Sequence, residues 1–173
     1  MNMENLHRLF TFLVLLLVQV LVLNHIQLFH CATPLLYVYL VLHFRRNYPR
    51  YAILLWSFFL GLSVDIFANT PGVAAASMTF VAFLQPHVMQ LFVPRDAADD
   101  FSPSIRTMGF QPFLYYSMVM VFIYCLLFFT LETFSFFNWI QWLASVFGSF
   151  VITMIFLIVI ENLDKKSSAK TDN

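Results

Sequence analysis

Long apolar runs separated by short polar breaks set the elements expected for this chain. A membrane-spanning helix needs about 20 predominantly apolar residues, with a range of about 17–25. On this criterion we predict an all-α integral membrane protein, a compact bundle of about six transmembrane helices that forms one domain over residues 1–162. The predicted helices cover residues 6–23, 28–44, 51–68, 73–93, 113–131 and 139–160. Residues 163–173 are predicted to be a flexible polar cytoplasmic tail.

The breaks between the runs differ in length and charge. With six spans, the breaks on one side are only a few residues long, and those on the other side are longer and charged. All nine lysines and arginines fall on that second side, which also holds both termini: Arg8, Arg45, Arg46, Arg50, Arg95, Arg106, Lys165, Lys166 and Lys170. Because cytoplasmic loops carry the excess of Lys and Arg, we predict that both termini are cytoplasmic.

Composition agrees with a chain that buries its surface against lipid. The chain is 61% hydrophobic and 10% charged, with 22 phenylalanines among 173 residues. Soluble domains are about 45–50% apolar and about 25% charged. The bilayer is therefore the expected surrounding, and the net charge of +0 gives no reason to expect a nucleic-acid partner. Cys31 and Cys125 are interpreted as small apolar side chains.

Asp65 is the first residue singled out, because it lies within a predicted span. A charged side chain at the bilayer centre costs about 2.5–3.5 kcal/mol, so a lipid-facing position is disfavoured. One hypothesis is a partner contact or polar site. The other is helix packing or a cap-like hydrogen bond to the turn at 69–72. The pattern leaves both open.

Small residues follow Asp65 at helical spacing. Ser57, Gly61 and Asp65 lie four residues apart and form one stripe on the predicted helix 51–68. Ala144 and Gly148 form a similar pair on the helix 139–160. Small residues let membrane helices approach closely, so these positions are predicted to contact another helix, within the chain or from a partner.

Other polar residues give weaker signals. Gln19 is predicted to hydrogen-bond across helices, and Gln85 lies beside a proline that is expected to kink its helix. His25 and His30 flank a turn with no third ligand at a fitting spacing, so no metal or other cofactor is predicted. No phosphate-binding loop, nucleophile elbow or zinc-protease motif is present in the sequence, which argues against an enzyme.

The segment from Gly61 through Asp65 to Gly72, with its Thr70-Pro71-Gly72 turn and the small residues that follow, resembles the signature region of the bacterial rod shape-determining protein MreD. The Phe-rich version found here is most similar to that of the Bacteroidetes. Gln19 and Pro34 also fit the family pattern. The matched positions are Gly61, Asp65 and Gly72.

The resemblance implies a non-enzymatic scaffold of the cell-elongation machinery in the bacterial inner membrane. Its partners would be MreC-like and MreB-like proteins and the peptidoglycan-synthesis complex of RodA with a class B penicillin-binding protein. It also implies a fold related to the substrate-binding components of energy-coupling factor transporters. That relation supplies the alternative function, a vitamin-binding component of an importer, for which a polar cavity would be needed.

Overall fold

The computed structural model describes residues 3–21, 35–46, 48–93, 101–133 and 139–171. These residues form helices and, within the described part, no strand, so the all-α prediction is confirmed there. The helices in chain order are α1 (Met3–Leu21), α2 (Val38–Leu42), α3 (Arg50–Ala68), α4 (Val73–Phe92), α5 (Ile105–Met108), α6 (Phe110–Thr133) and α7 (Trp139–Thr171).

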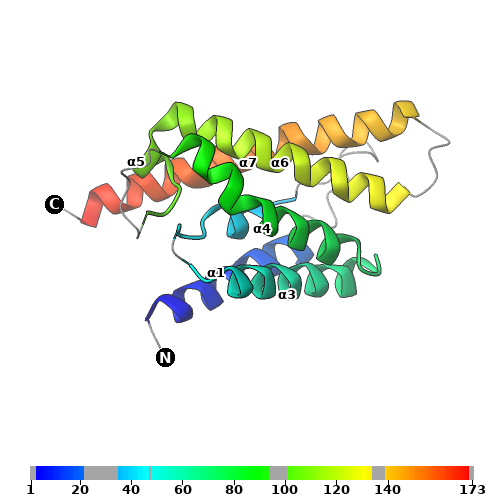
Figure 1. Cartoon of the computed structure of the whole chain (residues 1–173), viewed down its shortest axis with the longest axis horizontal. Coiled ribbons are helices and arrows are strands. Elements are labelled where there is room, and N and C mark those ends of the chain that lie inside the picture. Colours follow the sequence, from blue (N-terminus) through cyan, green and yellow to red (C-terminus); the bar gives the residue numbers. More distant parts are fainter. Residues whose placement is uncertain (1–2, 22–34, 47, 94–100, 134–138, 172–173) are drawn as a thin grey trace.

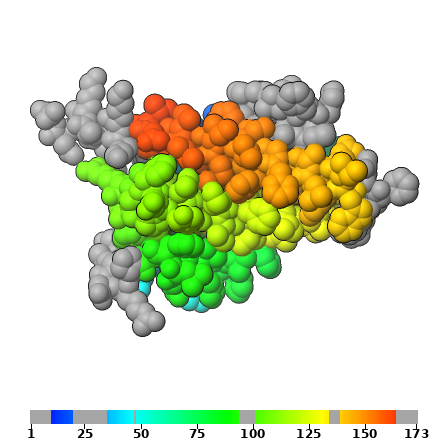
Figure 2. All heavy atoms as spheres, turned by 90° about the horizontal axis from the view of Figure 1, so that it is seen from above, coloured from blue at the N-terminus to red at the C-terminus, as the bar shows by residue number. Residues whose placement is uncertain are grey.

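The five long helices pack in a simple order. α1 packs on α3, α3 on α4, α4 on α6, and α6 on α7, while the short α2 contacts α1, α3, α4 and α6 (Figure 1). Figure 2 shows α6 and α7 side by side along one face of the molecule. The start of α1, the short α5 and the end of α7 lie at the same end of the bundle, on the left of Figure 1.

Three described helices are long and apolar enough to cross a membrane: Arg50–Ala68, Phe110–Thr133 and Trp139–Leu163. Large apolar side chains also cover much of the outside. Phe59 on α3, Phe83 on α4 and Ile140 on α7 are exposed, together with many of their neighbours. A soluble domain rarely exposes apolar surface on this scale, and a bilayer would cover it. The described part of the chain is thus all-helical, with three helices that could span a membrane.

The segment predicted as a helix over 28–44 differs from expectation where it is described. Residues 28–34 lie outside the described residues, and from 35 onward the α-helix is limited to the five residues of α2. All five are buried, as are Leu35, Leu36 and Tyr37 before them. Residues 35–44, called the buried segment below, are buried except for the partly exposed His43, which explains how a break in the helix can be tolerated there.

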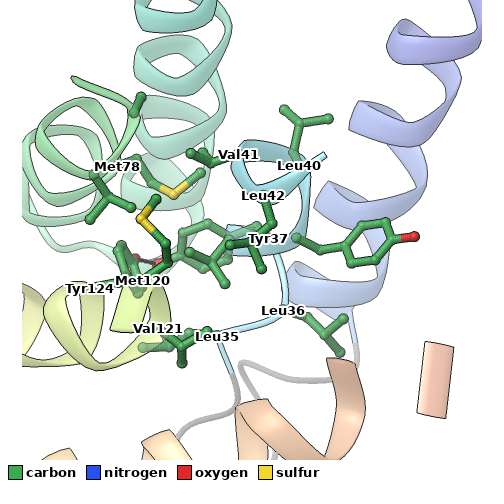
Figure 3. Packing of buried hydrophobic residues seen from close by; sticks show 14 of the residues in the cluster. Leu35, Leu36, Tyr37, Leu40, Val41, Leu42, Met78, Met120, Val121 and Tyr124 are labelled. Carbon is green, nitrogen blue, oxygen red and sulfur yellow. Dashed lines mark hydrogen bonds between the residues drawn. The ribbon is translucent and has the colours of Figure 1, made fainter. Parts of the chain in front are cut away.

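Figure 3 shows how the buried segment forms the centre of the core. Its apolar side chains meet Met78 of α4 and Met120, Val121 and Tyr124 of α6. The hydroxyl groups of Tyr37 and Tyr124 are hydrogen-bonded to each other, and both side chains are fully buried. The middle of the molecule is therefore filled by side chains of the buried segment, which follows α1 and precedes α3 in the chain.

At the C-terminus the helix extends beyond its predicted end at residue 160. Residues 163–171, predicted as part of a flexible tail, continue α7 as helix, which runs for 33 residues to Thr171. The reason is physical: extending an existing helix by one residue costs little once the helix is nucleated, and the leucine, lysine and alanine residues of this segment favour the helical state.

Candidate functional site

The close approach of α3 and α4 depends on Gly61. A Cβ added to this glycine would lie 2.6 Å from the Ala75 Cα and 2.7 Å from the Ala74 carbonyl oxygen. Real Cβ atoms do not come this close to backbone, so a larger residue would push the two helices apart. Gly61 lies one helical turn before Asp65, and the contact therefore brings the first turn of α4 against the Asp65 side chain.

Asp65 caps α4 from the neighbouring helix. Its Oδ1 accepts hydrogen bonds from the Ala74 N–H at 2.8 Å and from the Thr70 hydroxyl at 2.9 Å, and its Oδ2 accepts from the Ala75 N–H at 2.8 Å. The first N–H groups of a helix have no partner inside that helix. The N-cap of α4 is Gly72, which has no side chain to bind them, so Asp65 does so instead.

The turn between α3 and α4 is built for this arrangement. Asn69 and Gly72 both have positive φ angles, of 56° and 82°. The N–H groups of Asn69 and Thr70 donate to the Asp65 carbonyl oxygen, which ends α3. A left-handed residue is the usual end of a helix, and glycine adopts that conformation without strain. Backbone and side chain of Asp65 thus close one helix and open the next.

These contacts bring together Gly61, Asp65 and Gly72 in one helical hairpin. Asp65 is only 4% exposed, and Ser57, two turns before it, is fully buried. The three hydrogen bonds of Asp65 agree with the second hypothesis for this residue, which is helix packing or a cap-like hydrogen bond near the turn at 69–72. The Ser57 hydroxyl has no hydrogen-bond partner among the described residues. The hairpin leaves no room for a partner helix to reach this stripe.

Gln19 takes part in a second constellation, around the buried segment. Its Oε1 accepts a hydrogen bond from the Leu36 N–H at 3.2 Å, and the Thr153 hydroxyl of α7 accepts one from the Leu35 N–H at 3.0 Å. The interhelical hydrogen bond predicted for Gln19 is therefore made to backbone. A buried N–H without a partner costs about 1–3 kcal/mol, so each acceptor supports the break in the helix.

The other end of the buried segment is satisfied in the same way. The Tyr116 hydroxyl of α6 donates to the Leu42 carbonyl oxygen at 3.3 Å, and the Gln85 amide of α4 donates to the Phe44 carbonyl oxygen at 3.3 Å. Four helices thus each contribute one polar side chain to the backbone of this segment. The sequence signal for Gln19 and Gln85 was their polarity within apolar runs; Tyr116 and Thr153 gave none.

A third polar cluster lies where α7 meets α5. Glu161 is 3% exposed, and its Oε1 accepts a hydrogen bond from the Ile105 N–H at 3.0 Å. Its Oε2 accepts one from the Tyr39 hydroxyl at 3.3 Å and lies 3.2 Å from the His43 Nε2. Sequence reasoning did not single out Glu161, because the pattern of apolar residues does not reveal that α5 covers it.

The Ala144–Gly148 pair lies on the outer side of the bundle. Ala144 of α7 is exposed and Gly148 is partly exposed, between the exposed side chains of Phe147 and Val151. This small-residue pair is far in sequence from the α3–α4 hairpin and does not join it. His25 and His30 lie outside the described residues. Within the described part, no group of three or more His, Cys, Asp and Glu side chains could hold a metal ion.

Comparisons with known proteins add no relative. No protein-family model, curated protein or solved structure matches this chain. The functional argument therefore rests on the residues themselves: a hairpin held by Gly61 and Asp65, a buried segment capped by four helices, and an apolar exterior.

Proposed function

We propose that this chain is a non-enzymatic scaffold of the cell-elongation machinery in the bacterial inner membrane. The observation that carries the proposal is the structural role of Gly61, Asp65 and Gly72, the residues that resemble the MreD signature. All three serve the geometry of one helical hairpin, as expected for a signature that preserves shape rather than chemistry. The Asp65 carboxyl group within α3 accepts three hydrogen bonds from the chain itself, so it needs no substrate to explain it.

The proposed arrangement in the membrane has six spans with both termini in the cytoplasm. The segregation of all nine lysines and arginines to one side supports it. The common position of the start of α1, of α5 and of the end of α7 at one end of the bundle also fits an even number of crossings. In this arrangement α5 and the end of α7 would face the MreB-like partner in the cytoplasm.

The membrane partners need a surface that the chain does not use itself. Gly61 and Asp65 pack against α4 and Ser57 is buried, so the Ala144–Gly148 pair on the outer side of α7 is the small-residue position left for another helix. Small residues four apart let two membrane helices approach closely. We propose this face of α7 as the contact for the transmembrane helix of an MreC-like protein or of RodA.

Copurification from native membranes tests the proposal. The intact chain should bring down MreC-like and wall-synthesis proteins, and its depletion should round the cells. Ala144→Leu with Gly148→Leu should abolish copurification without lowering thermal stability, because both changes lie on the outer side. Val159→Leu, at an exposed position on the same helix, is the matched control and should copurify normally.

Two results would overturn the proposal. The first is purification without any wall-synthesis component together with unchanged cell shape on depletion. The second is a tightly bound vitamin-like molecule in the purified protein, which is the mark of an importer's binding component. The side chains of the buried segment fill the centre of the described bundle, and for this reason we place the scaffold first.

A further inference from the structure

A cavity of about 540 Å³ lies at the C-terminal end of α4. The described residues that line it are Arg46, Met89, Gln90, Leu91 and Val93. Among these residues Arg46 is the one with a charge, Gln90 adds an amide, and the other three are apolar. The Arg46 N–H donates to the Phe101 carbonyl oxygen at 2.9 Å, which fixes the backbone of Arg46 beside the end of α4.

The end of α4 brings partial negative charge to the same cavity. The last carbonyl groups of a helix lack N–H donors within that helix and form the negative end of its dipole. The Val93 N–H donates to the Met89 carbonyl oxygen at 3.0 Å. The donor for the next carbonyl, that of Gln90, would be residue 94, which is proline and has no N–H. A full positive charge and a set of carbonyl acceptors therefore lie around one cavity.

An exposed stripe of α4 leads to this cavity. Its members follow one another at spacings of three, four and three residues, which place them on one face of the helix: Phe80, Phe83, His87 and Gln90. Phe80 and Phe83 are 48% and 56% exposed. Seven residues separate Phe83 from Gln90, a rise of about 10 Å along the helix. The stripe thus changes from apolar in the middle of α4 to polar at the cavity.

We propose that the cavity and the exposed stripe of α4 bind one phospholipid of the cytoplasmic leaflet, with a phosphatidylethanolamine headgroup. The phosphate accepts hydrogen bonds from the Arg46 guanidinium, and the primary ammonium group donates to the carbonyl oxygens at the end of α4. An acyl chain lies along Phe83 and Phe80. The inference rests on the proposed arrangement in the membrane, in which Arg46 lies on the cytoplasmic side.

The charges around the cavity select this headgroup over the other common ones. A guanidinium binds a phosphate with two parallel hydrogen bonds, and a cation is favoured at a helix C-terminus. Phosphatidylethanolamine carries both complementary charges. The quaternary ammonium of phosphatidylcholine has no N–H and cannot donate to the carbonyl oxygens. Phosphatidylglycerol supplies the phosphate but no cation for the end of α4.

Native mass spectrometry of the purified full chain tests the site. The protein in a mild detergent is mixed with equal amounts of dioleoyl phosphatidylethanolamine and dioleoyl phosphatidylcholine, which differ only in the headgroup. The first lipid bound by the wild type should be phosphatidylethanolamine by about tenfold, the size of one charge-assisted hydrogen bond. Arg46→Gln should weaken the binding of both lipids by about tenfold, because both lose the partner of their phosphate.

Matched controls separate the site from general attraction. Arg50→Gln removes an exposed arginine at the start of α3 that is not among the residues lining the cavity, so it should bind as the wild type does. Phe83→Ala should weaken binding, whereas Phe59→Ala, at an exposed position on α3, should not.

Four results would overturn the lipid site. They are equal binding of the two lipids by the wild type, equal losses in Arg46→Gln and Arg50→Gln, tighter binding of phosphatidylglycerol than of phosphatidylethanolamine, and displacement of the lipid by free phosphoethanolamine, which has no acyl chain. The wild-type measurement decides the question even if a variant fails to fold. The purified chain is measured without partner proteins, so the outcome is separate from that of the copurification test of the scaffold.

Discussion

Gly61 of α3 and Ala75 of α4 meet backbone to backbone, and the 2.6 Å that a Cβ on Gly61 would leave to the Ala75 Cα shows that only glycine fits there. Because this contact holds the two helices close together, the Asp65 carboxylate can accept a hydrogen bond from the Ala75 N–H in the first turn of α4. One missing side chain and one carboxylate thus determine how two helices of the bundle pair.

Gly61→Ala should separate α3 from α4. Overpacking in a well-packed interior costs about 1–3 kcal/mol, and the hydrogen bonds of Asp65 would lengthen as well. The measurement is thermal unfolding in detergent, with Ser63→Ala as control, because Ser63 binds only the Phe59 carbonyl in its own helix. An unchanged melting temperature for Gly61→Ala would show that the hairpin is looser than the contact distances indicate.

Asp65→Asn should lower the free energy of unfolding by about 1–3 kcal/mol. The amide nitrogen would replace one acceptor oxygen and would face an N–H or hydroxyl donor with its own hydrogens. The same variant separates the two hypotheses for Asp65. If stability is unchanged and copurification of the partner is lost, the carboxylate serves a partner contact. Its hydrogen bonds to α4 would then contribute little to the stability of the fold.

Thr153→Val should destabilise the buried segment. Valine has nearly the same shape but cannot accept the hydrogen bond of the Leu35 N–H, so a buried donor remains unpaired at a cost of about 1–3 kcal/mol. Thr130→Val is the control, since the Thr130 hydroxyl only donates to Leu126 in its own helix. Equal melting temperatures for the two variants would mean that the Leu35 N–H has another partner.

The Tyr37–Tyr124 pair predicts a strongly non-additive double mutant. Tyr37→Phe or Tyr124→Phe alone leaves one buried hydroxyl unpaired, which should cost about 1–3 kcal/mol. Removing both hydroxyls leaves no polar group to satisfy, and the double variant should be close to the wild type in stability. A double-mutant cycle of thermal unfolding measures the coupling, and additive effects would argue against a hydrogen bond between the two rings.

Part of the candidate site could be predicted from the pattern. The polarity of Asp65 within an apolar run predicted a contact inside the protein or with a partner, and the turn at 69–72 supplies one of its three donors, Thr70. Thr153 could not be identified, because threonine in a membrane helix commonly bonds its own backbone. Its partner Leu35 lies 118 residues away in the chain. Glu161 was not singled out for the same reason, since its donors come from two distant segments.

The sequence by itself determined that the chain is helical, that it carries long apolar spans, and that a tight turn joins the helices on either side of residues 69–72. Only the tertiary structure decided that residues 35–44 lie inside the protein and that Asp65 binds the first turn of α4. The physical reason is that lipid and protein interior are equally apolar, so hydropathy cannot separate a segment that faces lipid from one enclosed by other helices. That choice is made by contacts between residues far apart in the chain.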